Sequence, residues 1–232
     1  MKICAIVAAS GSSTRFGCDK LEIVINDKPM LAWSVALLAK NKDIFEVVVA
    51  TSDINKAKRL TEGHIPTNVK FVMGGACREE SVKNAFETLP PCDVVLVHDG
   101  ARPFANDEII KRLFSEAKTS ACVIPVILAS SAVKRVVKDN VIENLQGNFH
   151  LAQTPQLVWS EPLKFAFKKY FDRLSDFNDE ASIIAAMGLS VVTVPGFGTN
   201  IKVTTQDDLF LAKAIAEKLY KRPDGLYPGK LA

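Results

Sequence analysis

The sequence predicts an α/β fold with a doubly wound, mostly parallel sheet and a protruding β-hairpin. Apolar β-rich runs recur along the chain, and amphipathic helical patterns lie between them. Such continuous apolar runs are typical of strands that are covered on both faces, as the strands of parallel sheets are. The hairpin is predicted because residues 131–148 contain two short β-rich runs with no helical period.

The predicted strands are short and almost purely apolar, and the predicted helices carry apolar residues at helical spacing. Helices are expected over 78–89, after Asn106, over 163–170 and over 209–219. The strands are expected at Ile3–Ala9, Phe45–Thr51, Val69–Met73, Val94–His98, Cys122–Val126 and Val191–Val194.

Helix start signals agree with this order of elements. Pro29 suits a first helical turn, and Asp53 and Asn106 have side chains that cap a helix N-terminus. Ser160 and Glu161 open a further helix. Strand and helix therefore alternate, which is the arrangement of a mostly parallel sheet.

The predicted hairpin turns at Asp139 and Asn140, which are flanked by β-rich runs. A two-stranded arm is only marginally stable by itself, so we expect it to pack against a second subunit in a homodimer. We expect one domain over residues 1–222 with the arm at about 131–150, and a separate tail at 223–232.

The composition is that of a globular protein and excludes several classes of function. With 232 residues, 48% hydrophobic and 24% charged, the chain is not expected to be disordered. Its net charge of +3, without a basic run, argues against a nucleic-acid partner. The five scattered cysteines contain no C-x-x-C pair that would indicate zinc or redox chemistry. No apolar run approaches ~20 residues, so we expect a cytoplasmic protein without a membrane partner.

The first candidate site segment is the loop after the first predicted strand. Its small residues, from Ser10 to Thr14, let backbone N–H groups approach an anion such as phosphate. Arg15 and Lys20 follow, and two cations there can hold a triphosphate and neutralise charge on a leaving pyrophosphate. Taken alone, such a loop is also compatible with a plain turn, and such cations with solvated surface charge.

Two further segments place polar groups beside predicted strands. Asp99 follows the strand at 94–98, at the edge where open α/β sheets bind ligands, and it can hold Mg²⁺ or a sugar hydroxyl. Arg102 is expected to brace Asp99, and His98 is expected to be a packed strand residue. The segment 74–81 combines two glycines with a serine and suits the reading of a base edge, although it also fits a plain helix entry.

Together, these segments resemble the 2-C-methyl-D-erythritol 4-phosphate cytidylyltransferase family over about residues 2–220. Their order and combination are hard to obtain by chance. The motifs are the small-residue loop with Arg15, then Lys20, Gly-Gly-x-x-Arg-x-x-Ser-Val, His-Asp-Gly-Ala-Arg-Pro, Gln153-Thr154-Pro155-Gln156, Asp179-Glu180-Ala181-Ser182 and Ile201-Lys202-Val203-Thr204. The resemblance implies a Rossmann-like nucleotidyltransferase fold with a dimerisation arm. It also implies transfer of CMP from CTP to 2-C-methyl-D-erythritol 4-phosphate, a polyol phosphate, with release of pyrophosphate.

The resemblance implies a role for each candidate site residue. Arg15, Lys20 and Lys202 would be the catalytic groups around the phosphates, and Mg²⁺ would be held largely by the triphosphate, with Asp99 as a protein ligand. The nucleotide would be bound by Ala9, Ser10, Gly11, Ser13, Gly75, Ala76, Ser81 and Gly100. The acceptor would be bound by Asp99, Gln146, Thr154 and Asn178.

The chain departs from the family pattern at a few positions. Ser13 stands where the family usually has a second glycine, and the gap between Arg15 and Lys20 is shorter than usual. On the acceptor side, Gln146 replaces a usual Arg and Asn178 a usual Thr. These changes leave open a cytidylyltransferase for another polyol phosphate, such as ribitol 5-phosphate, and a non-catalytic nucleotide-binding paralogue. A nicotinamide oxidoreductase is disfavoured because G-x-G-x-x-G is absent.

Overall fold

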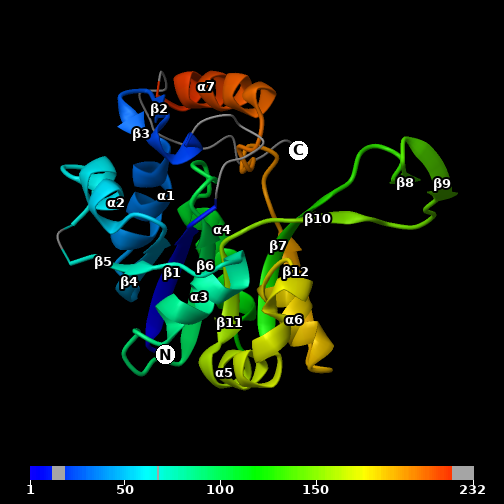
Figure 1. The fold of residues 1–232 in the computed structure, drawn as a ribbon, viewed down its shortest axis with the longest axis horizontal. Coiled ribbons are helices and arrows are strands. Elements are labelled where there is room, and N and C mark those ends of the chain that lie inside the picture. Colours follow the sequence, from blue (N-terminus) through cyan, green and yellow to red (C-terminus); the bar gives the residue numbers. More distant parts are fainter. Residues whose placement is uncertain (12–18, 67, 221–232) are drawn as a thin grey trace.

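The protein is described by a computed structural model that covers residues 1–11, 19–66 and 68–220. A central sheet of eight strands organises these residues (Figure 1). Its strands are β1 (Ile3–Ala9), β4 (Ile44–Thr51), β5 (Lys70–Met73), β6 (Val94–Asp99), β7 (Cys122–Leu128), β10 (His150–Ala152), β11 (Gln156–Trp159) and β12 (Val191–Pro195).

The sheet is mixed but mostly parallel, with the strand order β10-β7-β11-β6-β1-β4-β5 and with β12 paired to β7. β1 pairs in parallel with both β4 and β6, and β4 with β5. β11 runs antiparallel between β6 and β7, and β10 runs antiparallel to β7. The predicted α/β fold with a mostly parallel sheet is confirmed.

Helices cover both faces of the sheet, which explains why its central strands are apolar on both sides. On one face, α1 (Met30–Ala39), α2 (Ile54–Thr61) and α4 (Asp107–Glu116) pack against one core cluster with β1 and β6. On the other, α3 (Arg78–Phe86), α5 (Ser160–Lys169) and α6 (Glu180–Ala186) pack against a second cluster. Both clusters draw on alternate residues of β1, such as Ala5 and Ile6.

A third, smaller cluster lies at the upper end of the molecule in Figure 1. It joins α7 (Gln206–Tyr220) to the short hairpin of β2 (Val24–Ile25) and β3 (Lys28–Pro29). Buried residues from the loop after β6 and the segment before α7 complete it. The cluster therefore packs the segment around Ile23 beside the segment from Ile201 to Val203.

A two-stranded arm projects from the sheet, to the right in Figure 1. It consists of β8 (Lys134–Val137) and β9 (Asn140–Asn144), which pair antiparallel. Apolar side chains on the arm are exposed, among them Val136, Val141 and Ile142. The predicted hairpin is thus confirmed as a projection, whereas its role in dimerisation stays a prediction.

Most predicted elements are confirmed, with a few differences at their ends. The predicted strands correspond to β1, β4, β5, β6, β7 and β12, and Asp53 and Asn106 cap α2 and α4 through their side chains. Pro29 is the N-cap of α1 and lies in β3 instead of the first helical turn. The arm turns at Lys138 and Asp139, one residue earlier than predicted, because these two residues adopt positive φ angles of 48° and 64°.

Several elements were not predicted: β2, β3, β10, β11, α6 and the 3₁₀ helices η1 (Lys20–Glu22) and η2 (Phe171–Asp176). The predicted tail at 223–232 lies outside the described residues, and the single domain over 1–222 stays a prediction. Among the residues that the structure describes, no helix has the length and apolar composition needed to cross a membrane.

Candidate functional site

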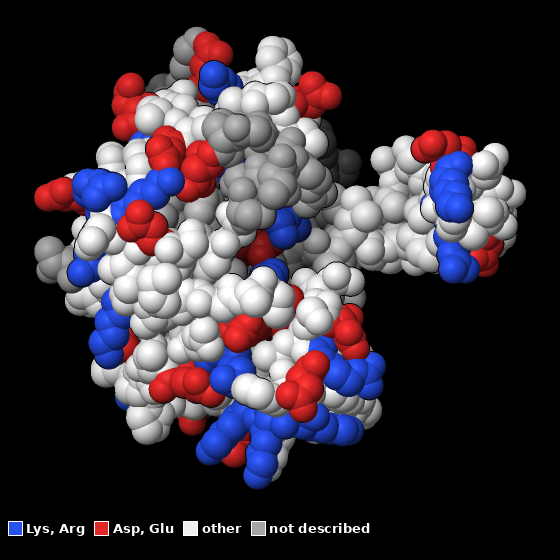
Figure 2. All heavy atoms as spheres, in the orientation of Figure 1, with Lys and Arg blue, Asp and Glu red and all other residues white. Residues whose placement is uncertain are grey.

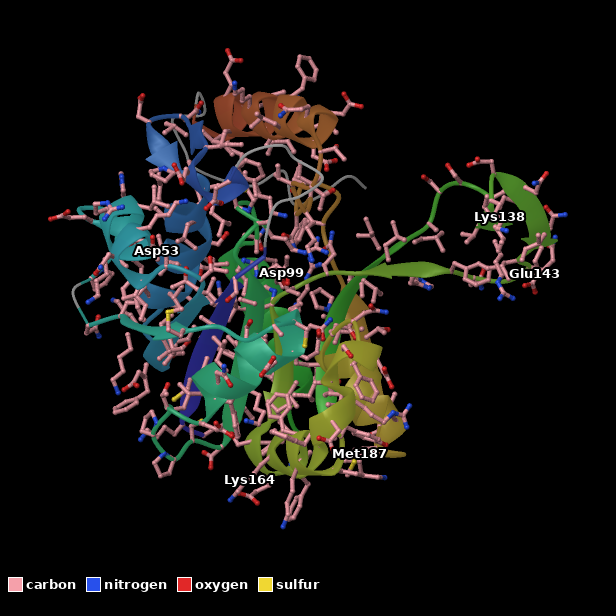
Figure 3. The ribbon with its side chains drawn as sticks, viewed as in Figure 1. Asp53, Asp99, Lys138, Glu143, Lys164 and Met187 are labelled. Atoms are coloured by element: carbon pink, nitrogen blue, oxygen red, sulfur yellow. The ribbon has the colours of Figure 1, made fainter. Side chains whose placement is uncertain are left out.

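The candidate site lies where β1, β4 and β6 end, at the carboxyl edge of the sheet. The Gly100 N–H donates to the Ala8 carbonyl at 2.9 Å, and the Gly74 N–H donates to the Thr51 carbonyl at 2.9 Å. These bonds hold the loops after β6 and β5 against the ends of β1 and β4. Asp99 lies at this edge in Figure 3, and Figure 2 shows acidic and basic side chains meeting in a hollow at the same place. This is the edge where open α/β sheets bind ligands.

Asp99 is the acidic centre of the site. Its Oδ1 accepts from Arg78 Nε at 2.9 Å, and its Oδ2 lies 2.9 Å from Lys202 Nζ and 3.4 Å from Arg102 Nε. Burial raises the pKa of Asp99, but the charges of Arg78, Lys202 and Arg102 outweigh it and hold that pKa well below its usual range. Asp99 is therefore ionised, and it brings together Arg102 from its own loop with Arg78 and Lys202 from distant parts of the chain.

Arg78, at the start of α3, connects Asp99 to α6. Its guanidinium binds Glu180 through two hydrogen bonds, of 2.9 Å from Nη1 and 3.1 Å from Nη2, and Nη1 also reaches Glu79 at 3.2 Å. Burial lowers the pKa of Arg78, but the charges of Glu180 and Asp99 outweigh it and raise that pKa above its usual value. Burial also raises the pKa of Glu79. Arg78 and Glu180 both lie in the motifs that carry the family resemblance, but no role was predicted for either residue.

Arg102 braces Asp99 as predicted and also fixes the loop that carries Lys202. Its Nη1 donates to the Asn200 carbonyl at 2.8 Å, and its Nη2 donates to the Ala152 carbonyl at 3.1 Å. Burial lowers the pKa of Arg102, and Asp99 offsets part of this effect. The Val203 N–H donates to the Ala101 carbonyl at 2.9 Å, so Lys202 is held on both sides.

His98 is a packed strand residue, as predicted. Its Nε2 lies 3.1 Å from the Arg102 carbonyl, which can only accept, so Nε2 carries the proton and Nδ1 accepts from the Thr154 hydroxyl at 2.9 Å. Burial lowers the pKa of His98 to about 4, so the ring is neutral near pH 7. Thr154 Oγ1 in turn accepts from the Asp99 N–H at 3.0 Å, which fixes the end of β6.

The loop after β1 meets the loop after β5. The Ser10 side chain lies so close to Gly74 that a Cβ at position 74 would clash with it, so glycine is required there. Ser10 Oγ is buried and has no hydrogen-bond partner among the described residues. Ala9 ends β1, and Gly11 lies beside open space. Ser13 and Arg15 lie outside the described residues.

The segment between β5 and α3 is held by its own side chains. The Gly75 N–H donates to Ser81 Oγ at 2.9 Å, and the Ser81 hydroxyl donates to the Cys77 carbonyl at 2.8 Å. The Ala76 N–H donates to Glu80 Oε2 at 2.6 Å. Because the Glu80 side chain crosses Gly75, any Cβ there would collide with it. Ser81 and Glu80 therefore shape the loop that carries Gly75 and Ala76.

Lys20 begins η1, which α2 holds in place. Asp19 caps η1 by accepting from the Leu21 N–H at 3.1 Å, and Lys56 pairs with Asp19 at 2.7 Å and with Glu22. Ile23, just after η1, packs in the third cluster with Val203. The segment that carries Lys20 therefore adjoins the segment that carries Lys202.

The sequence of the chain is similar to the sequences of known proteins. The profile of the family described as "IspD: 2-C-methyl-D-erythritol 4-phosphate cytidylyltransferase" matches residues 3–218. A 2-C-methyl-D-erythritol 4-phosphate cytidylyltransferase of Alkaliphilus metalliredigens is 35% identical, with 97% of this chain and 95% of that protein covered. The chain belongs to this family. The family's members are nucleotidyltransferases, so the predicted class of activity is confirmed.

Solved structures of 2-C-methyl-D-erythritol 4-phosphate cytidylyltransferases share the fold. The Francisella tularensis enzyme superposes with a TM-score of 0.82 at 29% identity, covering 93% of this chain and 100% of that one. The 4-diphosphocytidyl-2C-methyl-D-erythritol synthase of Anaerococcus prevotii superposes with a TM-score of 0.80 at 26% identity, covering 93% of this chain and 98% of that one. The nucleotidyltransferase fold predicted from the resemblance is therefore confirmed.

Nucleotidyltransferases of this family commonly use a divalent cation, and the described residues limit how the chain itself could bind one. Within them, no group of three or more Asp, Glu, His or Cys side chains could hold a metal. Asp99 is surrounded by three cations, which fits poorly with a metal bound by the protein alone. A cation that arrives with the phosphates of a nucleotide is compatible with this donor set.

Among the residues expected to bind the acceptor in this cytidylyltransferase family, three lie together. The Asp99 N–H donates to the Thr154 hydroxyl, and Asn178 precedes Asp179, the N-cap of α6, whose Glu180 binds Arg78. Gln146 lies between β9 and β10, on the arm that projects away from Asp99 (Figure 3). The chain therefore does not bring its own Gln146 to its own site.

Proposed function

We propose that this chain transfers CMP from CTP to 2-C-methyl-D-erythritol 4-phosphate, as the names of its relatives say of those proteins. The reaction joins a phosphate oxygen of the acceptor to the α-phosphorus of CTP, and the bond from that phosphorus to pyrophosphate breaks. The product is 4-diphosphocytidyl-2-C-methyl-D-erythritol. The observation that carries the proposal is the meeting of Lys202 with Asp99 at the sheet edge, in a chain that the family profile covers almost entirely.

Catalysis rests on positioning and charge neutralisation. The acceptor phosphate is already an anion near neutral pH, so the reaction needs no protein base. This agrees with His98, which is buried, neutral and bound on both nitrogens. Lys202 has three N–H donors, of which one points to Asp99, so the others can bind phosphate oxygens. We propose Arg15 and Lys20 as the other cations that stabilise the charge of the transition state.

We propose that CTP lies across the two loops that meet at Ser10 and Gly74. The triphosphate would be bound by the backbone of Ala9, Ser10, Gly11 and Ser13, and by the Ser10 hydroxyl, which has no hydrogen-bond partner among the described residues. The cytosine would be read by the loop that contains Gly75 and Ala76 and that Ser81 shapes, with Gly100 beside it. Ser10 supports this placement because a buried hydroxyl without a partner is costly unless a ligand satisfies it.

We propose that the divalent cation is Mg²⁺ and that the triphosphate of CTP holds it. Mg²⁺ usually keeps substrate phosphates and water as ligands and needs few protein groups. When bound, it offsets part of the negative charge on the triphosphate. Asp99 is the protein group that would hold the cation, and Lys202 lies 2.9 Å from the same carboxylate.

We propose that the arm forms a homodimer and brings Gln146 to the acceptor site of the partner subunit. The exposed apolar side chains of the arm support this proposal, because such residues on a projecting hairpin are typical of an interface. Asp99, Thr154 and Asn178 would bind the acceptor from the chain's own side. Gln146 can hydrogen-bond a phosphate but supplies no positive charge.

The test is a pyrophosphate-release assay with purified full-length chain, Mg²⁺ and a panel of substrates. We expect release with CTP and 2-C-methyl-D-erythritol 4-phosphate, and much slower release with ATP, GTP or UTP. A second assay uses ribitol 5-phosphate as the acceptor. It tests whether the departures from the family pattern at Gln146 and Asn178 change which acceptor the chain uses. Faster turnover with ribitol 5-phosphate would assign the chain to another polyol phosphate. Binding of CTP without turnover of any acceptor would contradict the proposal.

A further inference from the structure

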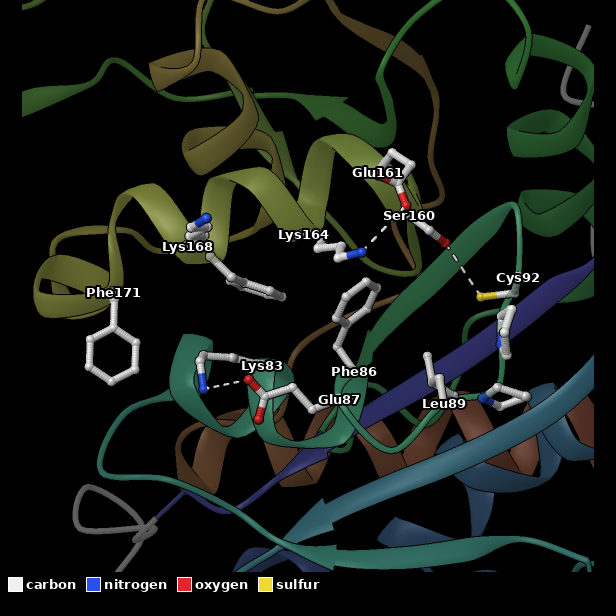
Figure 4. A pocket seen from close by; sticks show the side chains of 13 residues that line it. Lys83, Phe86, Glu87, Leu89, Cys92, Ser160, Glu161, Lys164, Lys168 and Phe171 are labelled. Carbon is white, nitrogen blue, oxygen red and sulfur yellow. Dashed lines mark hydrogen bonds and ion pairs between the residues drawn. The ribbon is translucent and has the colours of Figure 1, made fainter.

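A separate cavity lies at the end of α3 that points away from the candidate active site. It has a volume of about 750 Å³ and opens between α3 and α5 (Figure 4). Its walls come from the second half of α3, the loop before β6, α5 and the first residue of η2. None of the residues with a proposed role in cytidylyl transfer lines it. The cavity is therefore independent of the proposed function.

One part of the cavity is apolar and aromatic. Phe86 and Phe167 meet edge to face with ring centroids 5.8 Å apart, one from α3 and one from α5. Leu89, Pro90 and Pro91 continue this wall, and Phe171 is 60% exposed at its rim. A wall of apolar and aromatic side chains around a cavity of this size is typical of a small-molecule site.

The other part of the cavity carries charge. Lys83, Lys164 and Lys168 line it together with Glu87 and Glu161. Lys83 pairs with Glu87 at 2.8 Å, and Lys164 lies 3.9 Å from Glu161. Within the part of the chain that the structure describes, Lys168 makes no ion pair. The lining therefore keeps one positive charge in excess, which suits a ligand with a single negative charge.

We propose that this cavity binds an amphipathic monocarboxylate. Its alkyl or aryl part would lie along Phe86, Leu89 and Phe167, where burial of apolar surface favours binding. Its carboxylate would lie beside Lys164 and Lys168 at the rim. A diphosphate is less well matched, because Glu87 and Glu161 already offset two of the three lysines.

The first test compares three ten-carbon probes by isothermal titration calorimetry with the full chain. The probes are decanoate, decanol and decylammonium, each below the concentration at which it aggregates. We expect decanoate to bind more tightly than decanol, by about three- to tenfold for the charge alone, and decylammonium to bind more weakly than decanol. Equal binding of decanoate and decylammonium would overturn the proposal.

A variant tests the position of the carboxylate. We expect Lys164→Gln with Lys168→Gln to weaken decanoate binding by about three- to tenfold, and to leave decanol binding unchanged. Both lysines are exposed, so these changes should leave the fold intact. The matched control is Lys213→Gln, which removes an exposed lysine from α7. An equal loss in the control, or no loss in the double variant, would contradict the proposed site.

Cys92 provides an independent readout because it lines the cavity, with its Sγ 3.4 Å from Ser160 Oγ. A hydrogen bond with Cys4 lowers the pKa of the Cys92 thiol, which favours its reaction with iodoacetamide. We expect decanoate to slow alkylation of Cys92 several-fold, as followed by peptide mass spectrometry, and to leave Cys77 unaffected. Unchanged alkylation of Cys92 at saturating decanoate would place the bound ligand elsewhere.

An anionic lipid in a membrane also combines alkyl chains with a negative charge. Sedimentation with vesicles distinguishes a membrane from a free monocarboxylate as the ligand of this cavity. We expect the chain not to co-sediment with phosphatidylglycerol vesicles, because the aromatic wall is set into a cavity instead of a protruding face. Co-sedimentation that the lysine variant abolishes, without binding of free decanoate, would assign this surface to a membrane and overturn the proposal.

Discussion

Lys202 and Asp99 form the contact on which the proposed chemistry depends. We expect Lys202→Ala to lower the turnover number by about 10²–10³, as loss of a single donor to a transition state does in other enzymes. Pyrophosphate release under saturating CTP measures the effect. The control Lys213→Ala removes an exposed lysine of α7 and should leave turnover unchanged. Near-normal turnover of Lys202→Ala would rule out a catalytic role for this ammonium group.

Arg78 is expected to stabilise the folded chain. It is the common partner of Asp99 and Glu180, both of which are buried. Because Arg78→Met leaves buried Glu180 without its ion-pair partner and removes one of the three cations around Asp99, we expect it to lower the free energy of unfolding by about 3–5 kcal/mol. Urea unfolding followed by circular dichroism measures the loss.

The double variant Arg78→Met with Glu180→Met separates an unpaired charge from lost packing. It removes the carboxylate that Arg78→Met leaves unpaired, so we expect it to be more stable than Arg78→Met alone. A double variant that is less stable than the single variant would show that burial of Glu180 without Arg78 is not the main cost.

Because burial lowers the pKa of His98, the stability of the folded chain is expected to depend on pH. Its pKa is about 4 in the folded chain, against about 6.5 when unfolded, so the unfolded state binds more protons between these values. The contribution of His98 is complete above pH 6.5 and is lost as the pH falls toward 4, by about 3 kcal/mol in total. Urea unfolding of the wild type and of His98→Gln at several pH values measures it. We expect a shallower decline in the variant, and equal declines would refute this assignment.

At the residue scale, the sequence predicted the bracing of Asp99 by Arg102 because the two lie in one motif. The pair Arg78–Glu180 was not predicted, although both residues belong to recognised motifs. Their separation of 102 residues is closed only because α3 and α6 join the same core cluster on one face of the sheet, and no local pattern carries that information.

Among the helices and strands, those that are buried on both faces were predicted most accurately from the sequence. β1 and β6 are covered on both faces, and their uninterrupted apolar sequences predicted them nearly to the residue. β11 has only four residues, and its antiparallel place between β6 and β7 is decided by long-range pairing. α6 has seven residues, too few for a clear helical period, although its capping box of Asp179 and Ser182 was a usable signal.

The arm leads to a prediction about the oligomeric state of the chain. Val141 and Ile142 are 57% and 53% exposed in the single chain, and the proposed dimer would bury them. We expect Val141→Lys with Ile142→Lys to convert a dimer to a monomer, as measured by sedimentation velocity. The control Phe210→Lys changes an apolar residue of α7 that is 74% exposed and distant from the arm. Dissociation by the control alone would move the interface to α7.

At the scale of the whole molecule, the site is assembled from both ends of the chain. The loops after β1, β5 and β6 contribute from one side, and the segments before α6 and α7 contribute from the other. The family resemblance predicted this convergence, because its motifs were assigned to one site for the nucleotide and the acceptor. The physical reason is that parallel strands end at one edge, while the third core cluster fixes the segment with Lys202 over that edge.

A nucleotide that bridges these loops should therefore stabilise the entire fold. A ligand present at 100 times its dissociation constant adds about 2.7 kcal/mol to the free energy of unfolding, which corresponds to a rise of about 5–10 °C in Tm for a chain of this size. We expect that rise with CTP and Mg²⁺ and a smaller one with ATP, GTP or UTP at equal concentration. Lys202→Ala should reduce the rise with CTP, since it removes a cation that we propose to bind phosphate, whereas Lys213→Ala should not. Differential scanning fluorimetry measures each shift. Equal shifts with all four nucleotides would mean that the loop holding Gly75 and Ala76 does not read the base, even if the phosphates bind as proposed.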